Sequence, residues 1–90
     1  MTKRIHLFYS GRVQGVGFRY TVQGVAYDLE VVGWIKNLYD GRVEVVAEAE
    51  ESALKKFLSY VRQHFQDYIK NTDVQWQNAT GEFEDFRITF

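Results

Sequence analysis

A change of hydrophobic period across a cluster of glycines constrains the fold of this chain more than any other feature. Three of its seven glycines lie close together, at Gly11, Gly15 and Gly17. Residues 4–10, before the cluster, are rich in aromatic side chains and alternate as a strand does. From about Arg19 onward, apolar residues recur at helical spacing instead. The sequence therefore predicts a strand, a glycine loop and a helix in direct succession.

The rest of the chain continues to alternate between strand and helix periods, with no linker, internal repeat or low-complexity tract. The predicted elements are a helix over about 19–29, strands at 31–37 and 42–50, a helix over about 52–64, and strands at 72–78 and within 81–90. Asp40-Gly41 is a strong hairpin-turn signal between the second and third strands. This β-α-β-β-α-β order with an additional C-terminal strand predicts an α+β protein. We expect a two-layer α/β sandwich of ferredoxin-like form, whose mainly antiparallel sheet packs on two helices.

The same patterns predict some details of packing. Gly24 lies inside the first helix at a cost of about 1 kcal/mol relative to alanine, so we expect it to allow close packing of that helix on the sheet. The alternation of Val43 and Val45 with Glu44 predicts a third strand that is buried on one face. Ser52 is the expected cap of the second helix, whose apolar residues form one stripe.

Composition limits the class of protein. The sequence has no cysteine, which excludes disulfides, thiolate metal sites and a cysteine nucleophile. His6 and His64 form no recognisable metal motif, so we expect no metal and no cofactor. No apolar run approaches the roughly 20 residues that cross a membrane, and there is no secretory signal. We therefore expect one domain over residues 1–90, monomeric and cytoplasmic, with no membrane partner.

The distribution of charge says more than its total. The net charge of −1 argues against a general nucleic-acid binder. The first carboxylate of the chain is Asp28, and the four cations before it are Lys3, Arg4, Arg12 and Arg19. The glycine cluster therefore lies in a locally positive stretch, which suits a small anionic ligand.

The glycine loop has two interpretations. A glycine-rich connection can be no more than a tight turn. Three glycines that lead directly into a helix also let successive backbone amides point at one spot, where the positive helix end adds to their effect. Arg19, at the helix start, can grip two phosphate oxygens with its planar fork. We expect a phosphate-sized anion there, with Arg12 a solvated loop cation.

Known nucleotide motifs do not fit this loop. The nucleotide P-loop requires Gly-Lys-Ser/Thr at its end, and "GRVQGVGFR" has no such ending. Gly15 and Gly17 match the first two glycines of the dinucleotide fingerprint G-x-G-x-x-G, but this chain has Tyr20 where the motif requires its third glycine. The loop is therefore expected to bind phosphate without nucleotide machinery.

Three stretches of the sequence together closely resemble the acylphosphatase family: "GRVQGVGFR" (residues 11–19), "GWIKN" (33–37) and "DGRVEV" (40–45). Length and element order agree with the family as well. The resemblance implies a small cytosolic enzyme that hydrolyses acyl phosphates to a carboxylate and phosphate, without metal or cofactor. It implies an acyl phosphate as substrate, with inorganic phosphate as product and inhibitor.

The family's roles are carried over by position. The resemblance places the phosphate-gripping arginine at Arg19 and the water-orienting asparagine at Asn37. The substrate-binding cradle of loop amides falls on Gln14, Gly15, Val16, Gly17 and Phe18. Only the resemblance indicates a catalytic role for Asn37, because an amide at a strand end is more often a turn residue. No His, Asp or Glu lies in the loop or in residues 33–37, so the bound phosphate itself is expected to take the water's proton.

The chain also departs from the family. Glu30 and Ala49 stand where many relatives have glycine, and a non-glycine at the end of the first helix is expected either to cost strain or to force a different helix end. Two alternatives in function remain open. One is a relative that acts on carbamoyl phosphate. Such domains belong to larger proteins with zinc-binding cysteines downstream, and because this sequence has no cysteine, we expect a free-standing enzyme instead. The other is a non-enzymatic ferredoxin-like module that binds phosphate or RNA.

Overall fold

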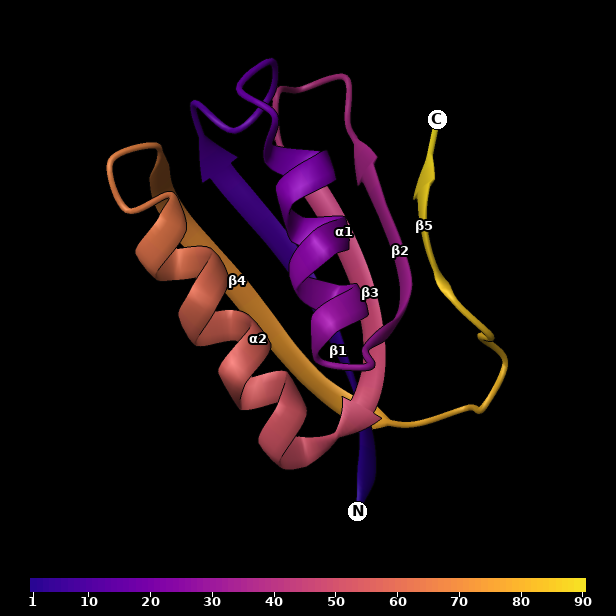
Figure 1. Cartoon of the computed structure of the whole chain (residues 1–90). Coiled ribbons are helices and arrows are strands. Elements are labelled where there is room, and N and C mark those ends of the chain that lie inside the picture. The colour runs from indigo at the N-terminus through magenta and orange to yellow at the C-terminus, as the bar shows by residue number, and fades with distance from the viewer.

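The chain folds as a helical layer on a five-stranded sheet (Figure 1). The computed structural model describes residues 1–90. Its elements are β1 (Thr2–Gly11), α1 (Phe18–Asp28), β2 (Val32–Asn37), β3 (Val43–Glu50), α2 (Glu51–His64), β4 (Ile69–Asn78) and β5 (Phe86–Thr89). The predicted β-α-β-β-α-β order with an additional strand is confirmed. Predicted bounds differ from the observed ones by three residues or fewer at most ends. Neither helix is long and apolar enough to cross a membrane.

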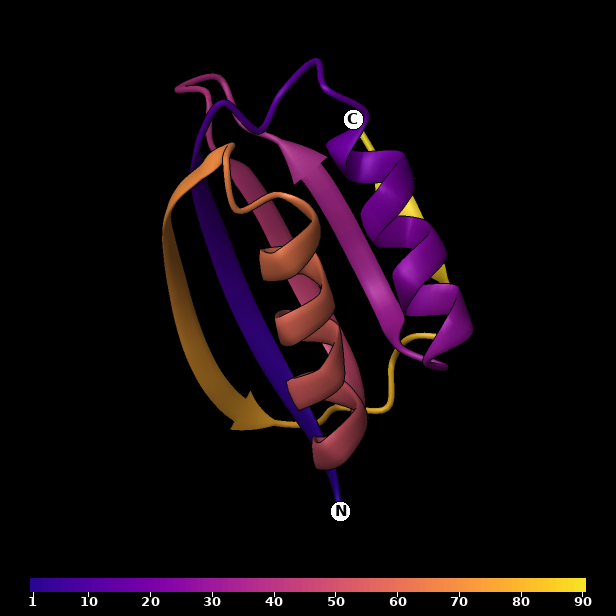
Figure 2. The same ribbon diagram turned by 60° about the vertical axis from the view of Figure 1, so that its left-hand side comes forward.

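The strand order in the sheet is β4-β1-β3-β2-β5. All neighbours pair antiparallel except β2 and β5, which run parallel. Both helices lie on one face of the sheet (Figure 2). β4 and β5 lie at opposite edges of the sheet, and β5 starts at the end of the sheet where β4 finishes. The chain therefore crosses that end of the sheet between β4 and β5. We call residues 79–85 the crossing segment.

The core lies between the helices and the sheet. Ile5, Leu7 and Tyr9 alternate along β1 into it and are almost completely buried. The predicted stripe of α2 faces them: Leu54, Phe57, Val61 and Phe65 are buried, and Leu58 packs at its edge. Apolar periodicity therefore predicted the buried face of both elements correctly.

The prediction that β3 is buried on one face only was wrong. Val43 and Val45 are buried as expected, but Val46 and Glu48 on the opposite face are 2% exposed. This strand lies in the middle of the sheet, and the crossing segment covers the outer end of its second face. Thr80 in that segment donates to Glu48 from its backbone N–H, at 3.0 and 3.1 Å, and from its hydroxyl, at 2.9 Å.

Two predicted details of the helices were also wrong. Ser52 is not a cap: β3 passes directly into α2, so Glu50 is the N-cap residue and makes no side-chain cap bond. Gly24 does not pack on the sheet, because it lies on the exposed side of α1 and a Cβ there would meet nothing within 4 Å. Glu30 lies in the backbone region where strain is expected, since it is the one non-glycine residue with positive φ, at 57°.

Candidate active site

The glycine loop, residues 11–17, joins β1 to α1 at the end of the sheet that also holds the β2–β3 hairpin and the end of β5 (Figure 1). Gly15 and Gly17 have φ of 77° and 75°, in the left-handed region that disfavours side chains. Gly17 is the N-cap residue of α1, which has no side-chain cap bond and no acidic residue in its first turn. The positive end of the helix is therefore left without an anionic partner.

From residue 13 onward, the backbone amides of this loop are free of partners within the protein. Arg12 N donates to Tyr68 O at 2.9 Å, and Thr21 N makes the first bond of the helix, to Gly17 O at 3.1 Å. No N–H group of residues 13–20, between these two donors, donates a hydrogen bond. Such a run of unpaired donors at a helix N-terminus suits an anion.

The side chain of Gln14 ties the glycine loop to the hairpin tip, residues 38–42. Its Nε2 donates to Leu38 O at 2.8 Å and to Arg42 O at 2.9 Å. The tip itself is closed by the bond from Leu38 N to Arg42 O at 2.8 Å. Gln14 therefore fixes the position of the loop relative to the end of β2, which the sequence did not indicate.

A hollow of about 640 Å³, the loop hollow, lies between these segments. It is lined by Gln14, Arg19, Lys36, Asn37, Leu38, Tyr39, Thr89 and Phe90. Three of the predicted site residues, Gln14, Arg19 and Asn37, therefore come together. The other four, Gly15, Val16, Gly17 and Phe18, do not line it, and the Phe18 ring instead packs in the core, 5.1 Å from that of Tyr9.

The lining of the loop hollow is cationic and contains no Asp or Glu side chain. Arg19 forms no ion pair and no hydrogen bond; its Cζ lies 5.2 Å from the centre of the Phe90 ring. Lys36 likewise has no carboxylate partner. Two unpaired cations in one hollow favour a dianionic ligand.

Asn37 ends β2 beside these cations. Its side-chain amide makes no hydrogen bond within the protein, and its Oδ1 is buried. Most buried polar atoms in proteins have a partner, so an unpartnered amide in a cationic hollow points to a role toward a bound reactant.

Arg12 lies outside the loop hollow. Its guanidinium stands over the Tyr68 ring, 5.2 Å from the ring centre. The residues that sequence reasoning missed are Lys36, Leu38, Tyr39, Thr89 and Phe90. Thr89 and Phe90 reach the site through the parallel pairing of β5 with β2, for which the local sequence gives no signal.

Comparisons with known proteins agree on one family. The family model described as Acylphosphatase matches residues 5–88. The acylphosphatase of Caldanaerobacter subterraneus subsp. tengcongensis is 40% identical over 89 residues, which cover 98% of this chain and 99% of the relative. The crystal structure of acylphosphatase from Bacillus subtilis has a TM-score of 0.90 at 35% identity and full coverage of both chains. HypF from T. kodakarensis has a TM-score of 0.84 at 27% identity, but this chain corresponds to only 12% of it.

Proposed function

Since the chain belongs to the acylphosphatase family and is an enzyme that hydrolyses acyl phosphates, we propose that Arg19 and the amides of residues 14–18 hold the phosphoryl group. Asn37 holds the attacking water. The observation that carries this proposal is a set of unpaired polar groups at one end of the sheet: the backbone amides of residues 13–20 at the start of α1, and the Arg19 guanidinium and Asn37 amide that line the loop hollow.

The phosphoryl group is held by charge and by directed donors. Arg19 supplies a guanidinium whose fork matches two phosphate oxygens. The loop amides and the positive end of α1 supply further donors toward the same group. Gln14 contributes its amide to this cradle, while its side chain fixes the loop to the hairpin tip. Preorganised donors of this kind stabilise charge as it redistributes in the transition state.

Asn37 provides both a donor and an acceptor for one water molecule. Held behind phosphorus, that water attacks in line with the bond to the leaving group. The new bond joins the water oxygen to phosphorus, and the bond from phosphorus to the acyl oxygen breaks. Its electron pair leaves with the carboxylate, which needs no protonation, so no general acid is required.

The water's proton passes to an oxygen of the bound phosphoryl group. No Asp or Glu side chain lines the loop hollow, and His6 lies on β1, outside it. The pH dependence of kcat should therefore show no limb that belongs to an enzyme carboxylate or histidine. Such a limb would contradict the substrate as proton acceptor.

Several further expectations belong to the same proposal. Inorganic phosphate, as the product, competes for the loop hollow and inhibits. Residues 1–90 act as one domain and as a monomer in the cytoplasm. Carbamoyl phosphate, with its small acyl group, is a poorer substrate than benzoyl phosphate, and a reversed order would favour the carbamoyl alternative.

The test compares three arginine and asparagine variants in metal-free hydrolysis of benzoyl phosphate. Arg19→Ala should lower kcat/KM by about a thousandfold or more and weaken inhibition by phosphate. Asn37→Ala should lower kcat by about a hundredfold while phosphate inhibition stays nearly unchanged. Arg12→Ala, in the same loop but outside the hollow, is the matched control and should retain wild-type turnover. Near-normal turnover of Arg19→Ala would refute the assignment.

A further inference from the structure

We propose that the outer wall of the loop hollow, formed by Leu38, Tyr39 and Phe90, binds the acyl group of the substrate. This acyl wall selects acyl phosphates whose acyl group is aromatic or large and apolar. The inference rests on the proposed function, because it assumes that Arg19 and Asn37 take the phosphoryl end.

The loop hollow is larger than the phosphoryl group requires. A phosphate has five heavy atoms, and at about 30 Å³ for each, the share of one water in the liquid, it fills about 150 Å³. The hollow measures about 640 Å³. A phosphoryl group therefore leaves most of the hollow free for the acyl group.

The side chains around that remaining space are apolar and strongly exposed. The side chain of Tyr39 is fully exposed to solvent, and that of Phe90 is 89% exposed. Single exposed aromatics are common on protein surfaces. These two come from different segments, the hairpin tip and the end of β5, and line one hollow together with polar groups that have no partners. Apolar walls around a few polar groups are typical of a ligand site.

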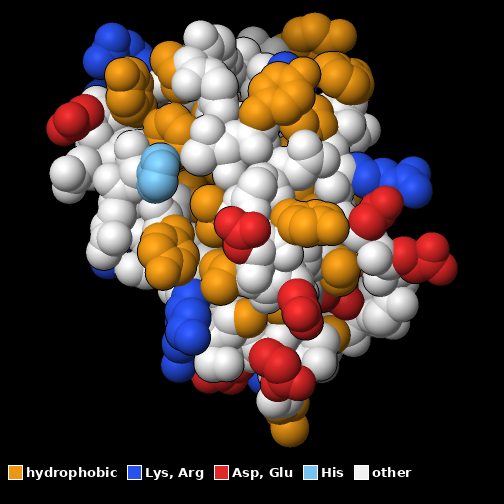
Figure 3. All heavy atoms as spheres, viewed as in Figure 1, with side chains coloured by type: hydrophobic (Ala, Val, Ile, Leu, Met, Phe, Trp, Pro, Cys, Tyr) orange, Lys and Arg blue, Asp and Glu red, His pale blue; other side chains and the backbone are white.

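The surface view agrees with this placement. Figure 3 shows hydrophobic side chains spread over this face of the molecule, including its top end. This is the end where Figure 1 places the glycine loop, the hairpin and the C-terminus. An apolar acyl group bound there would cover surface that is otherwise in contact with water.

Hydrogen bonds within the hairpin tip hold the backbone at Tyr39 at a fixed place relative to the glycine loop. Gly41 N donates to Leu38 O at 3.2 Å, and Arg42 donates to the Asp40 carboxylate from its backbone N and from Nε, at 3.1 and 2.8 Å. Gln14 Nε2 joins this tip to the glycine loop. An aromatic side chain on a rigid turn next to the phosphate site can contact an acyl group without the cost of ordering a mobile loop.

Phe90 belongs to both halves of the site. Its ring centre lies 5.2 Å from the Arg19 Cζ, and the residue also lines the hollow. Removing Phe90 would therefore disturb phosphate binding and acyl binding together. Tyr39 makes no hydrogen bond or ring contact with Arg19 or Asn37, so it is the residue whose loss separates acyl binding from phosphate binding.

Lys36 offers a competing chemistry. Its unpaired ammonium lines the same hollow, and an acyl group that carries its own carboxylate could pair with it. The observations favour the apolar class, because three apolar side chains line the outer part of the hollow and the phosphoryl charge already faces both cations.

The experiment measures kcat/KM for benzoyl phosphate and for acetyl phosphate in wild type, Tyr39→Ala and Tyr27→Ala. Tyr27 is a matched control, an exposed tyrosine on α1 outside the loop hollow. Tyr39→Ala should lose about 3- to 10-fold for benzoyl phosphate, the range of one aromatic contact, with acetyl phosphate changed less than twofold. Tyr27→Ala should change neither.

Equal losses for both substrates in Tyr39→Ala, or no loss for either, would overturn the acyl wall. So would a preference for a succinyl-type acyl phosphate over benzoyl phosphate that disappears in Lys36→Met. Failure of the proposed function looks different: wild type would then hydrolyse neither substrate, or Arg19→Ala would hydrolyse both normally.

Discussion

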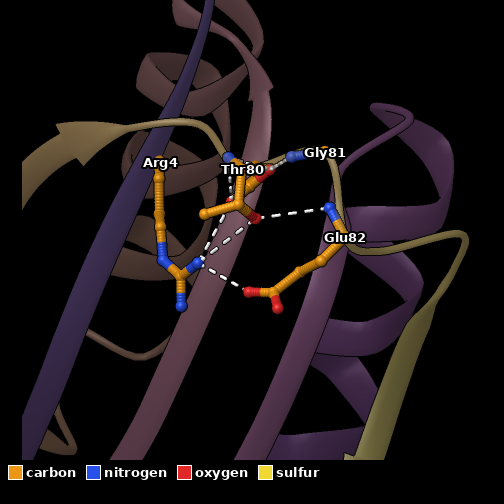
Figure 4. A network of polar contacts seen from close by, with 5 residues as sticks. Arg4, Thr80, Gly81 and Glu82 are labelled. Carbon is orange, nitrogen blue, oxygen red and sulfur yellow. Dashed lines mark hydrogen bonds and ion pairs between the residues drawn. The ribbon is translucent and has the colours of Figure 1, made fainter.

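Glu48 and the crossing segment form a buried polar network whose removal should destabilise the protein strongly. The Glu48 carboxylate accepts from Thr80 N, the Thr80 hydroxyl and Gly81 N at 2.9–3.1 Å, and from Arg4 Nη1 at 3.3 Å. Arg4 also reaches Glu82, at 2.7 Å, so its guanidinium lies between two carboxylates (Figure 4). Glu48→Gln keeps the shape of the side chain and removes its charge.

The expected loss follows from counting donors. In a glutamine at position 48 one oxygen is replaced by an NH₂ group, which faces either Gly81 N or Arg4. At least one donor then loses its acceptor, and the remaining bonds lose their charge. A hydrogen bond to a charged group contributes about 1.5–3 kcal/mol, and Glu48 is 2% exposed, so solvent screens little. We expect a loss of about 2–3 kcal/mol in the free energy of unfolding, or about 10–20 °C in Tm for a domain of this size.

The same network predicts a dependence on pH. Burial raises the pKa of Glu48, but hydrogen bonds from Thr80 and Gly81 and the charge of Arg4 outweigh burial and hold the pKa below its ordinary value. The unfolded chain therefore binds the proton more readily. Wild type has the full contribution of Glu48 at neutral pH and loses it as the pH falls through the folded pKa.

Urea denaturation of wild type and Glu48→Gln, from neutral pH to about pH 3, measures both effects. The difference in free energy should be constant above the ordinary pKa of a glutamate and shrink in acid. Glu84→Gln, exposed in the same segment and without an ion pair, is the control and should cost under about 0.5 kcal/mol. A difference that stays small at neutral pH, or that does not change on acidification, would refute the argument.

Three further substitutions test other features. Gly24→Ala should raise the free energy of unfolding by about 0.5–1 kcal/mol in urea denaturation, since the site is helical, exposed and open to a Cβ. Glu30→Gly should raise Tm by a few degrees in a thermal scan, because it removes a side chain from φ 57°; no change would mean that the turn bears no strain. Gln14→Leu should lower kcat/KM for acetyl phosphate about 10- to 100-fold, because it frees the glycine loop from the hairpin tip; unchanged kinetics would show that the loop holds its position alone.

Local chemistry predicted much of the phosphate end of the site. The glycines, the start of α1 and Arg19 are neighbours in the sequence, so their juxtaposition follows from one loop. Asn37 carries no such signal: an amide at a strand end has the same appearance whether it turns the chain or holds a water, and only the family resemblance singled it out. The free amides of residues 13–20 and the bridge from Gln14 to the hairpin tip needed the structure.

The wrong predictions about the fold share one physical cause: the hydrophobic period of a segment indicates its own secondary structure, but not which other segments pack against it. The pattern of β3 predicted a solvent-facing side, but Glu48 lies under the crossing segment, whose path depends on long-range pairing. The pattern around Ser52 suggested a cap, but β3 enters α2 without a loop. Gly24 was predicted to pack on the sheet because a glycine inside a helix often permits a close contact. In the structure it faces solvent.

Substitutions at the two ends of the sheet are expected to affect different properties of the enzyme. In the proposed site, phosphate binding depends on β1, the glycine loop and α1, which are consecutive in the chain. The acyl wall depends in part on Phe90, which reaches the site only because β5 pairs with β2, and β5 is brought there by the crossing segment that Glu48 and Arg4 hold at the opposite end. Loosening that segment therefore acts directly on the acyl wall through β5, and on the Arg19 guanidinium only through its contact with the Phe90 ring. In Glu48→Gln, measured where it is fully folded, the selectivity for benzoyl over acetyl phosphate should fall by a larger factor than the affinity for inorganic phosphate.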